Sequence, residues 1–183
     1  MSNPVLETIK KRRSIVRFES TPLEKEKVEA VLEAGQWAPS FLNKQPWKFI
    51  VVTDRSIKEQ LSQIVPTAFT KGIVEAPVCI AVAVDTEEDS FHFVEDGAIA
   101  TQNMALAAHS LGLYSCWIGV FNLRGEKNSS GNKIKKALDL PKAYRVISLL
   151  PIGHPLGEIP KKSRKVLEQL VYQEKFDPKR ATS

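Results

Sequence analysis

The chain has 183 residues, of which 43% are hydrophobic and 26% charged, and its formal net charge is +5. These values favour one globular domain, residues 1–183, with a substantial core. No apolar run reaches the length that spans a bilayer, and no hydrophobic segment follows the first charges, so we expect neither a membrane anchor nor a signal peptide. Cys79 and Cys116 lie far apart in apolar surroundings, which indicates buried thiols and a reducing cytoplasm rather than a metal or redox motif.

Taken in chain order, the predicted helices and strands do not alternate regularly. Apolar periodicity, caps and breakers predict helices at residues 5–11, 23–37, 54–64 with Asp54 as the N-cap, 90–111 and 133–138. Apolar β-rich runs predict strands at 49–52, 78–84, 114–119 and 146–152. This order favours an α+β fold over a doubly wound parallel sheet.

The other segments are less regular. Residues 65–75 are expected to be rich in loop, and residues 122–132 form a polar loop. The tail beyond Pro160 predicts a terminal amphipathic helix that packs against a neighbouring surface, with Val166, Leu167, Leu170 and Val171 on its apolar side. Residues 97–108 are small and apolar on nearly every side, which is typical of a helix buried in a core or a subunit interface, and Gly112 suits the turn that ends it.

Several familiar catalytic motifs are absent from the sequence. It contains no G-x-G-x-x-G after a strand, no G-x-x-x-x-G-K-[ST] and no G-x-S-x-G. His92, His109 and His154 are scattered without partners at metal-ligand spacing, so we expect no zinc site. If the protein is an enzyme, this pattern favours a bound organic cofactor that carries the chemistry.

Two basic segments near the ends of the chain suit a phosphate group. Arg12, Arg13 and Ser14, followed by Arg17, offer paired guanidinium donors and a hydroxyl. Residues 161–164 repeat the same chemistry. For both segments a solvated run of charge is the alternative.

The stretch from Trp37 to Val52 carries Ser40, Asn43 and Gln45 between prolines that fix the backbone. Ordinary capping and turn chemistry explains the serine and the asparagine, but it leaves the glutamine unexplained. The loop is therefore a third candidate for a cofactor site.

Together these segments resemble the nitroreductase family of flavin enzymes. The resemblance rests on four pieces in the family's order, spanning Arg12 to Arg164: RRSIVRF, APSFLNKQPWKFIVV, DGAIATQNMALAAHSLGLYSCWIG and LLPIGHPLGEIPKKSR. It implies an α+β fold with a central, mostly antiparallel sheet flanked by helices. It also implies an intertwined homodimer with tightly bound FMN at the subunit interface, and residues 97–111 as the central dimer helix.

The resemblance further implies roles for individual residues. Arg12, Arg13 and Ser14 would hold the FMN phosphate and ribityl chain, and Lys162 and Arg164 would complete the phosphate clamp. The other subunit would border the flavin with Pro39, Ser40 and Asn43, with Gln45 in the same loop. The segment that runs along the isoalloxazine ring would be Trp117, Ile118 and Gly119.

The implied reaction passes a hydride from NADH or NADPH through FMN to a small acceptor such as a nitroaromatic, a quinone or a flavin. It requires no catalytic side chain, because the protein positions the cofactor and stabilises its charge. Residues 65–72 and 122–132 are expected to shape the acceptor pocket. Phe69 is a candidate lining residue, with a core or lid-packing role as its alternative.

One position departs from the family's pattern. Val16 stands where relatives often carry Arg or Lys facing the flavin, so either Arg17 takes that role or the cation is missing. This departure keeps open another reaction on the same fold and FMN, either reductive dehalogenation or flavin fragmentation.

A basic nucleic-acid-binding module without flavin is the alternative from a different class. Lysines and arginines cluster at residues 10–13, 133–136 and 161–165, but no nucleic-acid motif accompanies them. This alternative predicts strongly salt-dependent binding to DNA or RNA and a colourless protein.

Overall fold

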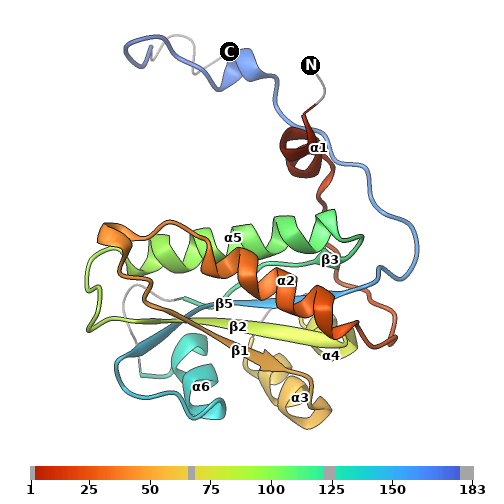
Figure 1. The fold of residues 1–183 in the computed structure, drawn as a ribbon, viewed down its shortest axis with the longest axis vertical. Coiled ribbons are helices and arrows are strands. Elements are labelled where there is room, and N and C mark those ends of the chain that lie inside the picture. Colours follow the sequence, from red (N-terminus) through yellow and green to blue (C-terminus); the bar gives the residue numbers. More distant parts are fainter. Residues whose placement is uncertain (1–2, 66–68, 122–126, 178–183) are drawn as a thin grey trace.

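The computed structural model describes residues 3–65, 69–121 and 127–177. They form a five-stranded antiparallel sheet in which the strands lie in the order β1-β2-β5-β3, and β4 also pairs with β5 (Figure 1). The strands are β1 (Trp47–Val52), β2 (Val78–Asp85), β3 (Tyr114–Ser115), β4 (Ile118–Gly119) and β5 (Tyr144–Gly153). All the predicted strands are present, and the expected strand at 114–119 is divided into two short ones.

Helices cover both faces of the sheet, as Figure 1 shows. One face carries α2 (Lys25–Gln36) and α5 (Phe93–Ser110), and α1 (Pro4–Lys11) adjoins α5. The other face carries α3 (Arg55–Ile64), α4 (Lys71–Glu75) and α6 (Ser130–Ala137), and two short 3-10 turns are η1 (Phe41–Asn43) and η2 (Leu167–Gln169). The predicted α+β fold with a central antiparallel sheet is confirmed.

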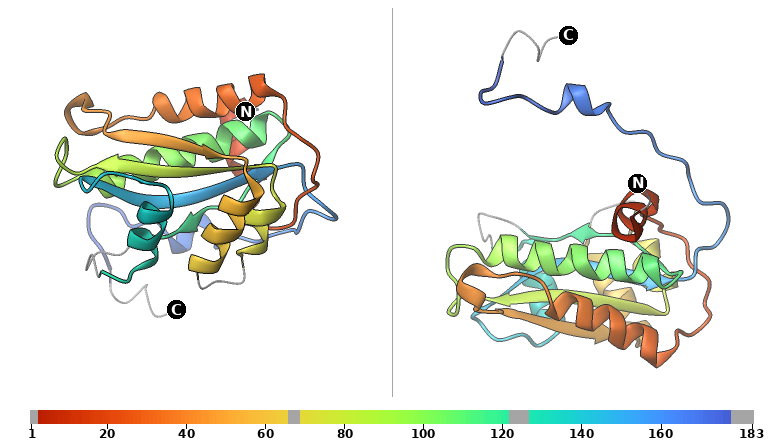
Figure 2. Two further views of the ribbon diagram at one scale, coloured as in Figure 1. Left: turned by 90° about the horizontal axis from the view of Figure 1, so that it is seen from below. Right: turned by 45° about the horizontal axis from the view of Figure 1, so that its top comes forward.

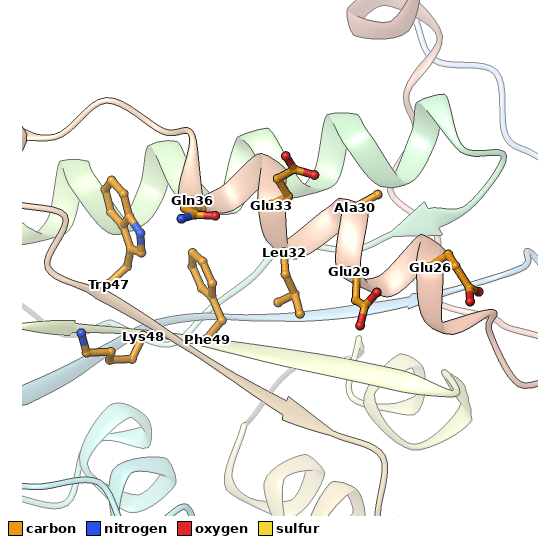
Figure 3. A pocket seen from close by; sticks show the side chains of 9 residues that line it. All are labelled: Glu26, Glu29, Ala30, Leu32, Glu33, Gln36, Trp47, Lys48 and Phe49. Atoms are coloured by element: carbon orange, nitrogen blue, oxygen red, sulfur yellow. The ribbon is translucent and has the colours of Figure 1, made fainter.

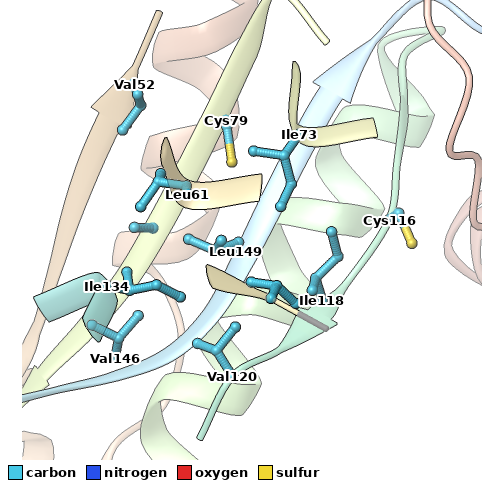
Figure 4. Close-up of a cluster of buried hydrophobic side chains, with 12 residues drawn as sticks. Val52, Leu61, Ile73, Cys79, Cys116, Ile118, Val120, Ile134, Val146 and Leu149 are labelled. Carbon is cyan, nitrogen blue, oxygen red and sulfur yellow. The ribbon is translucent and has the colours of Figure 1, made fainter. Parts of the chain in front are cut away.

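Strand β2 explains how two cores share one sheet. Its residues from Val78 to Val84 are all buried, because successive side chains point to opposite, helix-covered faces. Cys79 and Ala81 join Leu61, Ile134 and other apolar residues beneath α3, α4 and α6 (Figure 4). Val78, Ile80 and Val82 instead pack beneath α2 and α5.

Helix α5 lies close against the middle of the sheet. A Cβ atom on Gly97 would come within 2.6 Å of Ile147 Cγ1, so only glycine permits this approach. The buried hydroxyls of Thr101 and Ser148 form a hydrogen bond of 2.8 Å between the helix and β5. Gly112 ends the helix as predicted, with a φ of +77° that favours glycine.

Two expected loops need correction. Residues 71–75 form helix α4 rather than loop, and residues 66–68 lie outside the described part. Of the expected loop 122–132, residues 122–126 also lie outside it, and α6 begins at Ser130 because the Ser129 side chain caps it.

The predicted terminal helix is wrong. Just after β5, Pro155 still bridges to Phe18, but the described chain that follows, up to residue 177, is an extended arm that leaves the body of the molecule, as the right-hand view in Figure 2 shows. Its only regular element among the described residues is η2, and the side chains of Val166, Leu167 and Leu170 are 58–68% exposed. An amphipathic helix gains most of its stability from packing, and these apolar side chains are exposed on the arm.

Two further absences hold for the described residues only. None of their helices combines the length and the apolar character needed to cross a membrane. They also contain no group of three or more His, Cys, Asp and Glu side chains arranged to hold a metal ion.

Candidate functional site

The first predicted segment joins the edge of the sheet. Ser14 forms a parallel bridge with Ser115 at the end of β3, and the Ile15 amide donates to the Ser115 carbonyl at 3.1 Å. This pairing fixes the turn after α1 directly beside the segment that continues into Trp117. Two segments about a hundred residues apart in sequence are therefore neighbours.

The two arginines of this turn have different surroundings. Arg13 donates to the carbonyls of Lys10 and Arg12 at 2.7 and 2.8 Å, so its guanidinium closes the end of α1. Arg12 makes only a long contact of 3.4 Å with the Ser14 hydroxyl, which leaves most of its donors available. Arg12 is therefore the residue best placed to bind an anion here.

The positive charge of this turn reaches the end of α5. Burial lowers the pKa of His109, and the charges of Arg12 and Arg13 lower it further. The protonated imidazole is thus disfavoured first by burial and then by the positive charges nearby. A phosphate bound at the turn would meet a positive potential.

The segment from Trp117 to Gly119 presents an open backbone edge. The amides of Cys116 and Val120 donate to β5 carbonyls at 3.3 and 3.2 Å, and Ile118 lies opposite Leu149 in the same ladder. Because amide directions alternate along an antiparallel strand, the amides of Trp117 and Gly119 point to the other edge. Trp117 is 38% exposed, and a Cβ atom on Gly119 would meet no atom within 4 Å.

The described residues at this edge fit a flavin nucleotide. A flat ring requires an open, unobstructed approach, which the bare backbone at Gly119 provides. Ring oxygens and nitrogens require donors, which the two outward amides provide, and the phosphate requires a cation such as Arg12. The Ile118 side chain is buried among apolar residues beneath α3 and α6, so this residue could contribute to the site only through its backbone.

The third predicted segment, the loop around Ser40, lies at the opposite end of α5. The loop with Pro39, Ser40, Asn43 and Gln45 is held at the start of this helix by a bond from the Phe41 amide to Asp96, whereas the Arg12 turn adjoins the helix's end (Figure 1). An 18-residue helix is about 27 Å long. The loop and the Arg12 turn therefore lie at opposite ends of this helix.

The remaining predicted residues also lie apart. Lys162 and Arg164 are exposed on the terminal arm, and the bond from Arg164 to the neighbouring Ser163 carbonyl is purely local. Arg17 pairs with Glu75 of α4 at 3.0 Å, while Val16 packs against the core around Ile118. Within one chain, the described residues therefore place the turn with Arg12, Arg13 and Ser14 against Ser115, in the segment that leads to Trp117 and Gly119.

The sequence interpretation missed a group of buried polar side chains behind the loop. Asp89 and Asp96 are 1% and 3% exposed, and the His92 ring stacks on Phe41 with 4.1 Å between centroids. The available signal was Asp96 itself, a carboxylate at the start of a nearly all-apolar helix. Such a group is costly to bury unless it has partners.

A larger hollow of about 750 Å³ lies between α2 and β1 (Figure 3), but its chemistry does not suit this cofactor. Glu26, Glu29 and Glu33 line its helix side, and Lys48 is its only basic lining residue. Three carboxylates repel a phosphate. The edge at Gly119 is therefore the better candidate for this cofactor.

Comparisons with known proteins agree with this fold. The model of the family described as "Nitroreductase family" matches residues 9–74 and 67–154. A Methanothermobacter thermautotrophicus protein provisionally named as an NADH dehydrogenase/NAD(P)H nitroreductase is 36% identical over 82% of this chain and 77% of its own. The FMN reductase [NAD(P)H] of Bacillus subtilis is 29% identical over 95% of this chain and 75% of its own.

Solved structures give the same result, and more distant relatives show how varied the reactions are. An FMN-dependent nitroreductase from Clostridium difficile superposes with a TM-score of 0.85 at 32% identity, covering 93% of this chain and 99% of its own. An iodotyrosine deiodinase of Nematostella vectensis is 22% identical over 90% of this chain and 72% of its own, and a 5,6-dimethylbenzimidazole synthase of Rhodospirillum rubrum is 26% identical over 81% of each. On the family model, these relatives and the fold, the chain belongs to the nitroreductase family.

Proposed function

We propose that this chain, as a single domain, is an FMN-dependent oxidoreductase that passes a hydride from NADH or NADPH to a small acceptor such as a nitroaromatic, a quinone or a flavin. The observation that carries the proposal is the pairing of Ser14 with Ser115, which fixes the turn that carries Arg12 beside the segment that continues to Trp117 and Gly119. The family membership and the FMN- and NAD(P)H-dependent relatives support the cofactor and the donor. We expect the enzyme to act in the cytoplasm.

The chain's own groups would bind and orient the cofactor. When bound, FMN supplies the hydride chemistry. Arg12, with the hydroxyl of Ser14, would neutralise the phosphate, and Arg13 would add charge while it holds the end of α1. The outward amides of Trp117 and Gly119 would donate to the ring edge and stabilise negative charge there.

The site is completed by a second copy of the chain. Pro39, Ser40, Asn43 and Gln45 would border the ring from a partner chain, because this loop is attached near the start of α5, whereas the Arg12 turn that would hold the phosphate adjoins its end. Exposed apolar side chains on α1, on the loop and on the arm support such an interface, and they include Val5, Ile9, Trp37, Leu42 and Leu167. Lys162 and Arg164 would join the phosphate once the arm is ordered by the dimer.

The absorption spectrum of the purified protein tests the proposal. Flavin bands that bleach on anaerobic addition of NADH or NADPH are the expected result. A colourless protein that takes up no added FMN would contradict it and favour the nucleic-acid-binding alternative, for which salt-dependent DNA or RNA binding is the positive test.

The acceptor is tested on the reduced enzyme. We expect reoxidation by a nitroaromatic, a quinone or free flavin. Reoxidation by halogenated phenols alone, or consumption of the flavin itself, would instead indicate one of the two other reactions that the departure at Val16 keeps open.

Mixing two variants tests the shared site. Arg12→Ala and Asn43→Ala homodimers should each retain little FMN. A purified heterodimer of the two should bind about one FMN, because one of its two sites combines the intact turn of one chain with the intact loop of the other. If the heterodimer binds no FMN, the site is not shared.

A further inference from the structure

The loop around Ser40 has a strained backbone that needs support. Leu42, Asn43 and Gln45 have φ values of +48°, +56° and +52°, in the left-handed region that side chains other than glycine rarely adopt. Inside the loop, the Ser40 hydroxyl accepts from the Gln45 amide at 2.9 Å, and the Gln45 side chain donates to the Asn43 carbonyl at 3.1 Å. Gln45, which turn chemistry left unexplained, therefore helps hold the loop. Strained segments persist only where their surroundings over-determine them.

Asp96 supplies an anchor from outside the loop. Its side chain is on the first turn of α5 and is buried, with 3% of the residue exposed. Its Oδ1 accepts from the Phe41 amide at 3.2 Å, while its Oδ2 is buried without a hydrogen-bond partner among the described residues. Keeping a carboxylate here is unfavourable for the fold by itself, since burial penalises its charge.

A second contact fixes the same residue of the loop. The Phe41 ring stacks on His92, and His92 in turn is placed by Asp89, which is 1% exposed. Asp89 Oδ1 accepts from the amides of Phe91 and His92 at 2.9 and 3.0 Å, and its Oδ2 lies 3.5 Å from His92 Nδ1. Phe41 is thus held through its amide by one acid and through its ring by the other.

We infer that Asp96 is a positioning residue for the cofactor of the partner subunit, and that the Asp89–His92 pair assists it. By anchoring Phe41, it holds Ser40 and Asn43 in the one strained arrangement that can face the flavin across the interface. The inference rests on the proposed function, because it assigns Asp96 to the half of the site that this chain lends to its partner. A role in its own chain's phosphate turn is excluded by the length of α5.

The test compares Asp96→Ala with Asp96→Asn and with Glu95→Ala, an exposed acid on the same turn, as the matched control. Asp96→Ala should weaken FMN binding at least about tenfold, because it leaves the Phe41 amide without its acceptor. Asp96→Asn keeps an acceptor oxygen and should bind FMN within about threefold of the wild type. Glu95→Ala should bind FMN like the wild type. The measurement is fluorescence titration of the FMN-free proteins with FMN.

Heterodimers then show to which half of the site Asp96 belongs. Paired with Arg12→Ala, the Asp96→Ala chain should recover about one tight FMN site. Paired with Asn43→Ala, it should recover none. The opposite pattern, recovery in both pairings, or Asp96→Ala homodimers that bind FMN normally would overturn the inference.

Two controls keep this outcome separate from other failures. If Asp96→Ala does not fold, His92→Ala removes only the ring stacked on Phe41, and it should give a smaller loss with the same pairing pattern. Loss of recovery between Arg12→Ala and Asn43→Ala would instead count against the shared site. A wild-type chain that binds no FMN would count against the proposed function.

Discussion

Gly97 and Gly119 show how the surroundings of one residue type decide what a mutation tests. We expect Gly97→Ala to lower the free energy of unfolding by about 1–3 kcal/mol, because its methyl group would overlap Ile147 and Val84 in the core. Gly119→Ala should change stability by less than about 0.5 kcal/mol, since no atom lies within 4 Å of its added Cβ. Urea unfolding of the FMN-free proteins measures both effects.

The Gly119→Ala variant also tests where FMN binds. Gly119→Ala should weaken FMN binding several-fold in spite of its normal stability, because the methyl group would stand on the open edge. Normal FMN affinity in Gly119→Ala would remove this edge from the site.

The buried charge of Asp96 predicts a pH dependence of stability. Desolvation raises its pKa, so the folded state binds this proton more tightly than the unfolded state. The contribution of Asp96 to the free energy of unfolding therefore increases as the pH falls through the raised folded pKa, and it is lost as the pH rises above that pKa. The stability of Asp96→Asn relative to the wild type should accordingly be greatest near pH 7 and should decline towards pH 4. If the free energies of unfolding of the two proteins differed by the same amount at every pH between 4 and 7, burial would not destabilise the carboxylate.

At the scale of single residues, local chemistry was predictable and burial was not. Asp54 was expected to cap α3, and its side chain does accept from the Ile57 amide at 2.9 Å. The roles of Asp89 and Asp96 depend on which loop packs over them. The sequence places Asp96 at the start of a nearly all-apolar helix, but it does not tell which loop covers the carboxylate.

Helix α4 determines the position of Arg17. Its Glu75 pairs with Arg17 at 3.0 Å, and its end is tied to α3 by a bond of 2.6 Å from the buried Lys58 ammonium to the Ala76 carbonyl. The 51%-exposed Phe69 lies just before this helix. This arrangement directs Arg17 towards α4, so we expect no cation from this segment at the flavin.

Arg17→Ala tests this expectation. The ion pair is partly exposed, so its loss should change stability by less than about 1 kcal/mol. FMN affinity should stay within about twofold of the wild type. Glu75→Gln is the complementary variant, because it removes the competing partner and leaves the arginine. A large loss of FMN in Arg17→Ala would show instead that this guanidinium reaches the cofactor.

At the scale of elements, the sequence predicts the helices and strands whose own apolar residues pack against the sheet. Helices α2 and α5 and strands β1, β2 and β5 carry their own apolar pattern against the sheet, and the sequence predicts their approximate positions. The terminal helix was predicted from Val166, Leu167 and Leu170 in the same way, but apolar spacing does not tell which surface will cover it. The structure leaves these side chains exposed on an extended arm.

For the whole molecule, the arm is expected to carry two separate tasks. A chain that ends at Lys165 keeps Lys162 and Arg164 but loses the exposed apolar part. It should dissociate at least about tenfold more readily, since each apolar side chain buried at an interface contributes on the order of 1 kcal/mol or more. Sedimentation at falling protein concentrations measures this dissociation.

The matched variant separates the other task. The full chain with Lys162→Ala and Arg164→Ala should remain a dimer but lose FMN affinity, because only the phosphate contacts are removed. Unchanged dimerisation of the shortened chain would show that the apolar end of the arm does not join the subunits.

The distance along α5 also has a consequence for how a newly synthesised chain would become active in a cell. If each chain carries two half-sites that can never meet each other, a newly made chain is inert until it finds a copy. Activity per molecule then falls on dilution, because the dimer dissociates. The cofactor would stabilise the dimer, because a ligand that binds only the dimer shifts the equilibrium towards it as the ligand concentration rises. When FMN is scarce, the fraction of chains in the dimer would therefore fall.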